Sequence, residues 1–241
     1  MPPRTQCRID QCRALHGDCP TCDVRPFSIC AAVSGTELSG LEALSRRVRF
    51  DARATLFDQD DQAAGVFNIT SGCVRLSKTL SDGRRQIIGF AIPGDFLGLT
   101  FTDRCHFTAE AVEPVTACRF NQKAFSVFLA GQPDLMHRLL EFSARDLAMA
   151  REQMVVLGRR SAQERLAAFL TALRTRHERL GRQGATLQLS MGRQDIADYL
   201  GLTIETVSRT LTKMARDELI LIVPNGIRFL RLEHLQHLAA A

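Results

Sequence analysis

The chain has 241 residues, of which 45% are hydrophobic and 24% are charged, and its formal net charge is +5 at pH 7. This balance is typical of a globular protein with room for two modest domains, and it excludes a chain dominated by disorder. The positive charge is compatible with a polyanionic partner but does not by itself indicate one. Because the first ten residues lack an apolar signal-peptide core and no run of about 18 apolar residues occurs, we expect a cytoplasmic protein with no membrane partner.

The N-terminal segment, residues 1–30, is rich in cysteine. It holds five of the eight cysteines and shows no helical or strand periodicity. In the cytoplasm these thiols stay reduced, which favours metal, cluster or redox chemistry over a disulfide framework. The trio Cys19-x2-Cys22-x7-Cys30, together with Cys118 at the end of a predicted strand, supplies four thiolates suited to a cubane iron-sulfur cluster or to tetrahedral zinc. A redox thiol switch is a third option on spacing alone.

Residues 31–130 are predicted to form an antiparallel β-roll. From about residue 54 to residue 120, short runs of alternating apolar and polar residues are separated by turn signals. Val74, Leu76 and Leu80 alternate with polar residues, and the turn at residues 81–83 leads into a further strand at residues 86–90. Several short strands separated by turns are typical of a roll or barrel.

Residues 131–158 are predicted to form a long helix that begins near Pro133. Apolar or small residues on it follow alternating steps of three and four, the spacing of a coiled-coil seam: Leu140, Ser143, Leu147, Ala150, Met154 and Leu157. Packing of the helix on its own domain is the alternative, because only about three heptads are present. We interpret the helix as a dimerisation helix and the protein as a homodimer. A second helix is predicted from Ser161 to about Leu180.

Residues 159–241 are predicted to contain a winged helix-turn-helix. Ala197 suits the close crossing of two helices, Gly201 suits the tight turn between them, and Val207 suits the core between the helices. Downstream, two apolar runs flank the turn Pro224-Asn225-Gly226 and predict a hairpin that serves as the wing.

The solvent-facing residues of the second helix are the predicted DNA readers. They are Thr203, Glu205, Ser208, Arg209 and Thr212. Arg209 can make a bidentate contact to guanine, Glu205 can accept from cytosine N4, and Ser208 is short enough to approach a neighbouring base. The alternative is a small helical hairpin with a β-ribbon, in which these polar residues only contact solvent. The turn, the wing and the polar helix face occur together, which favours double-stranded DNA as the partner.

The strings LGLTIETVSRTL and RSAQERLAAFL resemble the anaerobic branch of the CRP/FNR superfamily, which includes FNR-, FixK-, FnrN- and AadR-like regulators. The resemblance runs from Cys19 to about Leu232. It implies an α+β fold with a β-roll of the cyclic-nucleotide-binding type, a long dimerisation helix and a C-terminal winged helix. It also implies inverted-repeat DNA with TTGAT-like half-sites, read by Glu205, Ser208 and Arg209, and RNA polymerase as a partner.

At two places the sequence differs from the cyclic-nucleotide-binding members of this superfamily. Cyclic-nucleotide binders of the superfamily carry a glutamate where this chain has Leu99, and an Arg-Ser pair where it has Thr108-Ala109. A cyclic phosphate without an arginine partner would be weakly held, so we expect no cyclic nucleotide. No phosphate-binding glycine loop, nucleophile elbow or paired-carboxylate site occurs, and we expect no enzyme activity.

The resemblance favours a 4Fe-4S cluster over zinc or no metal, because oxygen-sensing relatives hold one on three N-terminal cysteines and one central cysteine. It implies Cys19, Cys22, Cys30 and Cys118 as ligands, although the seven-residue gap between the last two of the trio is longer than in the enteric proteins. Cys105 is the competing fourth ligand. Cys73 is expected to be a small buried hydrophobe, Cys7 and Cys12 to be exposed thiols, and His16 to be a surface residue. The expected function is an oxygen- or redox-responsive transcription regulator.

Overall fold

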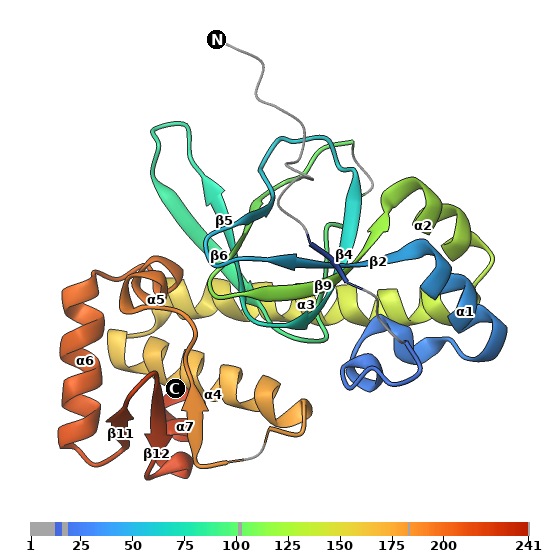
Figure 1. Ribbon diagram of the computed structural model, residues 1–241. Coiled ribbons are helices and arrows are strands. Elements are labelled where there is room, and N and C mark those ends of the chain that lie inside the picture. The colour runs from blue at the N-terminus through green and yellow to red at the C-terminus, as the bar shows by residue number, and fades with distance from the viewer. Residues whose placement is uncertain (1–12, 16–18, 101–102, 183, 241) are drawn as a thin grey trace. The chain divides into compact units, whose positions relative to one another are not determined.

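The computed structural model describes residues 13–15, 19–100, 103–182 and 184–240, with the backbone alone for 13–15. These residues form two compact units, and the boundary between Ser143 and Ala144 lies inside a single long helix. The first unit is built mainly of strands with short helices beside them, and the second is mainly helical with a small sheet (Figure 1). The predicted α+β class, with a β-roll, a long helix and a C-terminal helix-turn-helix, is confirmed.

The strands of the first unit form two antiparallel sheets. The order is β1-β2-β9-β4-β7 in one sheet and β3-β8-β5-β6 in the other. Their bounds are β1 (Arg13–Leu15), β2 (Ser45–Phe50), β3 (Thr55–Phe57), β4 (Gly65–Ser71), β5 (Val74–Thr79), β6 (Arg85–Ala91), β7 (Phe96–Leu97), β8 (Thr108–Ala111) and β9 (Val115–Asn121).

Alternating residues of these strands face two different cores. On β9, Val115 and Ala117 belong to a core that takes residues from both sheets, and this core fills the roll. Phe120 instead belongs to a second core on the outer face of the five-stranded sheet, as does Val66 of β4. Because side chains alternate across a strand, Cys118 lies on the same outer face as Phe120.

The outer face is covered by the N-terminal segment and by helices. The segment contains two short 3-10 turns, η2 (Arg25–Phe27) and η3 (Ile29–Ala32), which precede α1 (Gly35–Leu44), and α2 (Gln122–Ala130) follows β9. The segment, α1, α2 and the first part of the long helix all contribute buried residues to the outer core.

Helices α1 and α2 were not predicted from the sequence. α1 contains two glycines and buries only Leu38 and Leu41, so its helical signal is weak. α2 is better marked, because the side chain of Asn121 accepts a hydrogen bond from the backbone N–H of Ala124 at 3.1 Å and caps its first turn. Both helices are stabilised by packing on the outer core rather than by local propensity.

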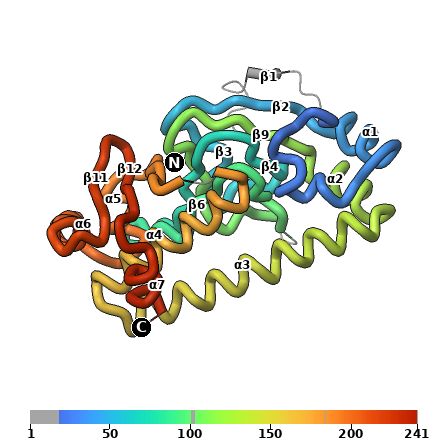
Figure 2. The backbone as a smooth tube through the Cα atoms, turned by 90° about the horizontal axis from the view of Figure 1, so that it is seen from below, coloured from blue at the N-terminus to red at the C-terminus, as the bar shows by residue number. Residues whose placement is uncertain are grey.

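The long helix α3 (Pro133–Arg159) runs without interruption, as the tube view shows (Figure 2). Leu135, Leu139 and Phe142 are buried on one side of its first part. Five of the six predicted seam positions are exposed instead, among them Leu140 at 61% and Met154 at 71%, while Leu157 is half-buried. The expected dimer seam is therefore a solvent-facing stripe of apolar and small residues along α3.

The second unit contains the helices α4 (Ala162–Arg179), α5 (Arg193–Leu200), α6 (Ile204–Arg216) and α7 (Leu232–Ala240) and the strands β10 (Thr186–Gln188), β11 (Ile220–Val223) and β12 (Gly226–Phe229). The predicted helix from Ser161 is confirmed, and Ser161 and Glu164 form a capping box at its start. The wing hairpin is confirmed as β11 and β12, and β10 adds a third strand that was not predicted. α7 was also not predicted.

Arg165 of α4 ties the end of α3 to the end of α5. Its guanidinium donates hydrogen bonds to the carbonyl oxygens of Arg160, Leu200 and Leu157 at 2.8, 2.9 and 2.9 Å. The amide of Gln153 on α3 donates to the carbonyl of Tyr199 at 3.1 Å. Helix C-terminal carbonyls lack partners within their own helix, so these contacts satisfy them and hold the helices together.

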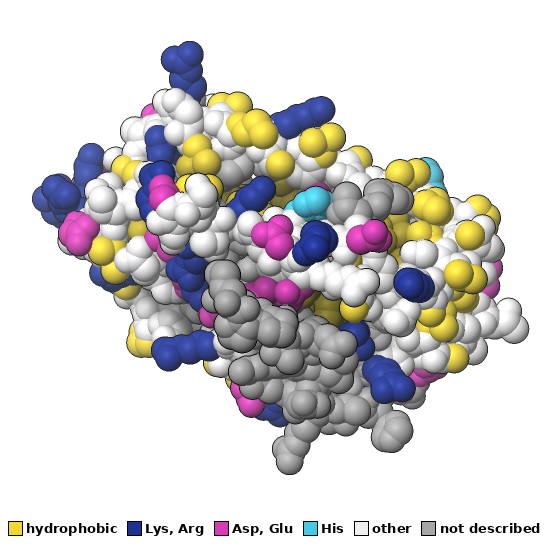
Figure 3. All heavy atoms as spheres, turned by 90° about the horizontal axis from the view of Figure 1, so that it is seen from above, with side chains coloured by type: hydrophobic (Ala, Val, Ile, Leu, Met, Phe, Trp, Pro, Cys, Tyr) yellow, Lys and Arg dark blue, Asp and Glu magenta, His cyan; other side chains and the backbone are white. Residues whose placement is uncertain are grey.

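None of the described helices is long and apolar enough to span a bilayer. On the face seen in Figure 3, the described Lys and Arg side chains are interspersed with Asp, Glu and hydrophobic side chains.

Candidate DNA-binding site and cysteine site

The crossing of α5 and α6 meets the steric requirements of a helix-turn-helix. Ala197 and Val207 are fully buried, as expected where two helices approach closely. Gly201 ends α5 in the left-handed conformation, at φ 61° and ψ 40°, which residues with a Cβ adopt at a cost. The three residues singled out from the sequence therefore have the predicted structural roles.

The start of α6 is held by Thr203, the residue just before the helix. Its hydroxyl oxygen accepts a hydrogen bond from the backbone N–H of Thr206 at 3.2 Å. Glu205 lies in the exposed first turn, where a negative charge interacts favourably with the helix dipole. The pKa of the Glu205 carboxyl is lowered by hydrogen bonds from its own backbone N–H and from the Thr203 side chain, and further by Arg209. Glu205 is therefore an ionised acceptor at neutral pH.

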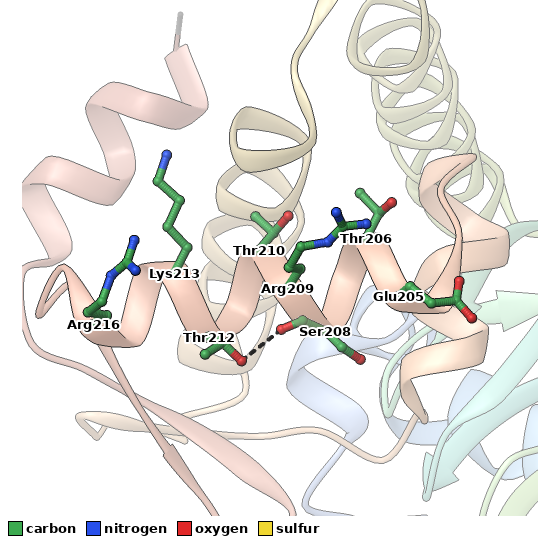
Figure 4. Close-up of a pocket in the computed structure, with 8 residues that line it drawn as sticks. All are labelled: Glu205, Thr206, Ser208, Arg209, Thr210, Thr212, Lys213 and Arg216. Atoms are coloured by element: carbon green, nitrogen blue, oxygen red, sulfur yellow. Dashed lines mark hydrogen bonds between the residues drawn. The ribbon is translucent and has the colours of Figure 1, made fainter.

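One face of α6 presents a row of polar and basic side chains to solvent (Figure 4). It carries four of the five predicted readers and four residues that were not predicted. The complete set is Glu205, Thr206, Ser208, Arg209, Thr210, Thr212, Lys213 and Arg216. Lys213 and Arg216 could have been found from the sequence, because they follow Arg209 at steps of four and three and so lie on the same helical face.

A basic residue of α5 reaches this row. Arg193 donates a hydrogen bond from Nη1 to the hydroxyl of Ser208 at 3.2 Å. The hydroxyl of Thr212 donates to the backbone carbonyl of Ser208 at 3.0 Å, the contact drawn in Figure 4. Arg193 was not predicted as part of the site.

The charges on the α6 face suit a nucleic acid. Arg209, Lys213 and Arg216 are exposed cations, and Glu205 is the one acidic side chain of the row. Cations on an exposed helix contact phosphates, while arginine, glutamate and serine can contact base edges in a major groove. One helix therefore carries side chains suited to both kinds of contact.

The wing lies directly after α6 in the chain. Asn225 has φ 54° in the turn between β11 and β12, a conformation that asparagine tolerates. A Cβ at Gly226 would come within 2.5 Å of the Leu187 carbonyl oxygen on β10, so glycine is required where these strands meet. Arg228 of β12 is exposed and donates to the Thr186 hydroxyl at 3.4 Å.

The cysteine site lies in the first unit, on the outer face of the five-stranded sheet. Cys118 is in the middle strand of the three neighbours β2, β9 and β4, where the N-terminal segment covers the sheet. Cys30 is buried in the outer core, and Cys19 and Cys118 pack against this core. The fold therefore brings Cys118 to a segment that lies almost ninety residues away in sequence.

The four predicted ligands influence one another electrostatically. Burial raises the pKa of Cys19 to about 12, and Glu42 together with the other three cysteines of the set adds to the rise. The Cys19 backbone N–H donates to the Glu42 carboxylate at 3.1 Å. Burial also raises the pKa of Cys118 to about 11, with Cys30 and Cys22 adding to the rise. These thiols hold their protons at neutral pH and are weak nucleophiles in this state.

The remaining cysteines are arranged differently. Cys105 belongs to the core inside the roll, on the opposite side of the sheet from the trio, and Cys73 is buried as predicted. None of the six described cysteines forms a disulfide. Cys7, Cys12 and His16 lie outside the described residues.

The four cysteines supply only sulfur ligands, which suit zinc or an iron-sulfur cluster. Among the described residues, no three Cys, His, Asp or Glu side chains lie close enough together to bind a single metal ion. Tetrahedral zinc requires four thiolates at Zn–S distances of about 2.3 Å, whereas a cubane cluster places four irons between the thiolates and needs a wider set. Unpartnered buried polar atoms of Arg25, Arg47 and Asn68 occur beside these cysteines. Four cysteine sulfurs with the guanidinium groups of Arg25 and Arg47 near them are a donor set that suits an anionic thiolate-bound group.

Two segments of the chain match known domain families. Residues 47–132 match the cyclic nucleotide-binding domain, and residues 164–238 match the Crp-like helix-turn-helix domain. The first match covers most of the β-roll, and the second covers the helix-turn-helix and the wing.

Characterised proteins are similar over nearly the whole chain. The transcriptional activatory protein AadR of Rhodopseudomonas palustris is 45% identical over 239 residues, 99% of this chain and 98% of AadR. The nitrogen fixation regulation protein FixK of Bradyrhizobium diazoefficiens is 46% identical over 92% of this chain and 94% of FixK. The structure of FixK2 from Bradyrhizobium japonicum matches with a TM-score of 0.76 and 31% identity, covering 82% of this chain and 98% of that one.

Proposed function

Because the chain belongs to the CRP/FNR family of transcription regulators, we propose that it reads inverted-repeat DNA with TTGAT-like half-sites as a homodimer. It is a DNA-binding regulator and not an enzyme. The observation that carries the proposal is the exposed α6 face, with its mixture of base-reading and phosphate-contacting side chains. The proposed site of action is the cytoplasm, with RNA polymerase as the partner on the promoter.

The proposed base readers are Arg209, Glu205 and Ser208. Arg209 has the reach and the paired donors for guanine O6 and N7, and ionised Glu205 can accept from cytosine N4. Thr203 and Thr212 lie at the N-terminus and along the exposed side of the same helix, and Lys213 and Arg216 supply cations for flanking phosphates.

The proposed dimer contact is the exposed stripe on α3: Leu140, Ser143, Leu147, Ala150 and Met154, with half-buried Leu157 at its end. Two copies of the chain are needed, because the two half-sites lie about one turn of the DNA helix apart and each is read by its own recognition helix. The occupant of the stripe is thus a second copy of the chain, in the manner of a coiled-coil seam.

We propose no cyclic nucleotide as the signal. Thr108 and Ala109 stand where a phosphate-binding Arg-Ser pair would be needed. Ala109 is fully buried, and the Thr108 hydroxyl already accepts a hydrogen bond from the Gln59 backbone at 3.0 Å. A cyclic phosphate would have no charged partner from these positions.

The proposed signal is oxygen or another oxidant, sensed through a 4Fe-4S cluster on Cys19, Cys22, Cys30 and Cys118. When bound, such a cluster supplies a group whose integrity responds to oxidants. The chain's own part is to hold four deprotonated thiolates on the outer face of the sheet, beside α1 and the start of α3. Occupancy of this site favours the DNA-competent dimer over other states, which is how a sensor can control binding.

The test is anaerobic purification of the full chain, followed by analysis for iron, sulfide and zinc and by a visible spectrum. We expect iron and sulfide in equal amounts and a brown protein. Cys118→Ser should abolish the colour and Cys105→Ser should retain it, because Cys105 lies inside the roll. A colourless protein with stoichiometric zinc would replace the cluster with the structural-zinc alternative.

DNA binding is tested separately, with a duplex that contains two TTGAT-like half-sites and a second duplex with the half-sites scrambled. We expect preferential binding to the first. Equal binding to both duplexes would contradict the proposed sequence recognition, whatever the metal content of the protein.

A further inference from the structure

A row of three side chains crosses the outer face of the sheet at Cys118. In the strand register, Cys118 of β9 is directly opposite Arg47 of β2 on one side and Asn68 of β4 on the other. Side chains directly opposite each other in neighbouring strands lie on the same face, with Cβ atoms about 5 Å apart. Arg47 and Asn68 therefore flank the cysteine on both sides.

The alternation of neighbouring residues agrees with this placement. Phe67 and Ile69 face the core inside the roll, whereas Val66 belongs to the outer core. Asn68 must then face outward with Val66, on the side that the N-terminal segment covers. It is 2% exposed, so water does not reach it freely.

Both flanking side chains carry buried polar atoms without a hydrogen-bond partner. These atoms are Nε of Arg47 and Oδ1 of Asn68. A third atom of this kind, Nε of Arg25, belongs to the cysteine segment itself, and Arg25 influences Cys30 electrostatically as Arg47 influences Cys118. Unpaired buried polar groups are costly and rare, so three around one site indicate a missing hydrogen-bonding group.

The two guanidinium groups indicate that this group is an anion, because they donate hydrogen bonds and carry positive charge. Oδ1 of Asn68 is an acceptor as placed, and rotation about the last bond of the amide turns its NH2 toward an acceptor instead. A cubane cluster with four thiolate ligands carries net negative charge and presents sulfur acceptors. Hydrogen bonds to such sulfurs from the surrounding protein are a known means of stabilising clusters.

We propose that Arg47 and Asn68, with Arg25, form a donor shell that stabilises an anionic iron-sulfur cluster bound beside Cys118. The proposal rests on the cluster site proposed above. Arg25 also donates from Nη2 to the Val33 carbonyl at 2.9 Å and so helps to fold the segment. Arg47 and Asn68 are therefore the cleaner positions for a test.

The test uses the full chain reconstituted anaerobically with ferrous iron and sulfide, in four forms: the parent, Arg47→Met, Asn68→Leu and the control Arg46→Met. Both test substitutions keep the approximate size of the side chain and remove its polar atoms. Arg46 is the neighbouring arginine on β2 and is exposed. The first measurement is the anaerobic rate of bleaching by excess iron chelator, and the second is the melting temperature of the cluster-free protein.

We expect all four forms to bind iron and sulfide, with bleaching about tenfold faster in Arg47→Met and Asn68→Leu than in the parent and in Arg46→Met. The melting temperature of the cluster-free variants should be equal to that of the parent or higher, because an unsatisfied buried group has been removed. This second result separates a donor to the cluster from a side chain that only supports the fold.

Bleaching rates within twofold of the parent would overturn the donor shell while leaving the cluster itself in place. A lower melting temperature of both cluster-free variants, together with unchanged bleaching, would likewise overturn it in favour of a purely structural role. If the parent chain took up no iron, the proposed function would fail first, and the donor shell with it.

Discussion

The substitution Lys213→Ala separates phosphate contact from base reading on α6. Lys213 is exposed, follows Arg209 by four residues and lies on the same helical face. It is too far along the helix from Glu205 to share the base edges that the first two turns would read. We therefore expect Lys213 to contact a phosphate and to contribute affinity that depends on salt but not on sequence.

The magnitude follows from counterion release. Each phosphate neutralised on B-DNA contributes about −0.9 to the slope of log K against log salt. A dimer presents two copies of Lys213, so its loss should make the slope shallower by about 1.8. Between about 50 mM and about 200 mM salt, the parent should then lose about ten times more affinity than the variant loses.

The assay is a fluorescence anisotropy titration of a labelled inverted-repeat duplex at several salt concentrations. Lys123→Ala is the matched control, since Lys123 is an exposed lysine on α2 in the other unit. The preference for the inverted repeat over a scrambled duplex should remain in Lys213→Ala. An unchanged salt slope, or a loss of sequence preference at constant slope, would refute the assignment of Lys213 to phosphate.

Three further substitutions test other parts of the molecule. Arg209→Ala should weaken the free energy of DNA binding by about 1–3 kcal/mol per half-site and relax discrimination at one base pair. The check is a binding assay in which that base pair is varied, and unchanged selectivity would show that Arg209 does not read it. Gly201→Ala should lower the free energy of unfolding by about 1–2 kcal/mol, because φ is 61° there; urea denaturation measures this, and an equal or higher stability would contradict it. Ala150→Asp places a carboxylate on the exposed stripe of α3, where two copies would face each other, and should shift the protein toward monomer in analytical ultracentrifugation; an unaltered dimer would show that Ala150 lies outside the seam.

Local signals predicted the elements whose structure is decided by neighbouring residues. The turn of the helix-turn-helix was predictable because Ala197, Gly201 and Val207 are each required by short-range sterics. The wing was predictable because Pro224-Asn225-Gly226 is a turn sequence between two apolar runs. α1 and β10 were not predictable in this way, because they are short and are stabilised by distant partners.

The exposed polar face of α6 was only partly predicted. Glu205, Ser208, Arg209 and Thr212 were predicted from motif geometry, whereas Lys213 and Arg216 were not, although helical spacing places them on the same face. The contribution of Arg193 to this face could not be predicted from helical spacing. Its hydrogen bond to Ser208 joins residues fifteen apart on two helices, and only the crossing of those helices brings them together.

The sequence by itself determined which local motifs this protein carries. The cysteine trio and the E-x-x-S-R string of α6 can be recognised without knowledge of the fold, because each lies within a short stretch of the chain. The tertiary structure decided which distant residues join them. The antiparallel register of β2, β9 and β4 puts Arg47 and Asn68 beside Cys118, and the N-terminal segment partly covers that row. The physical reason is that a strand's periodicity shows which residues share a face, whereas its partners and their register depend on contacts far apart in the chain.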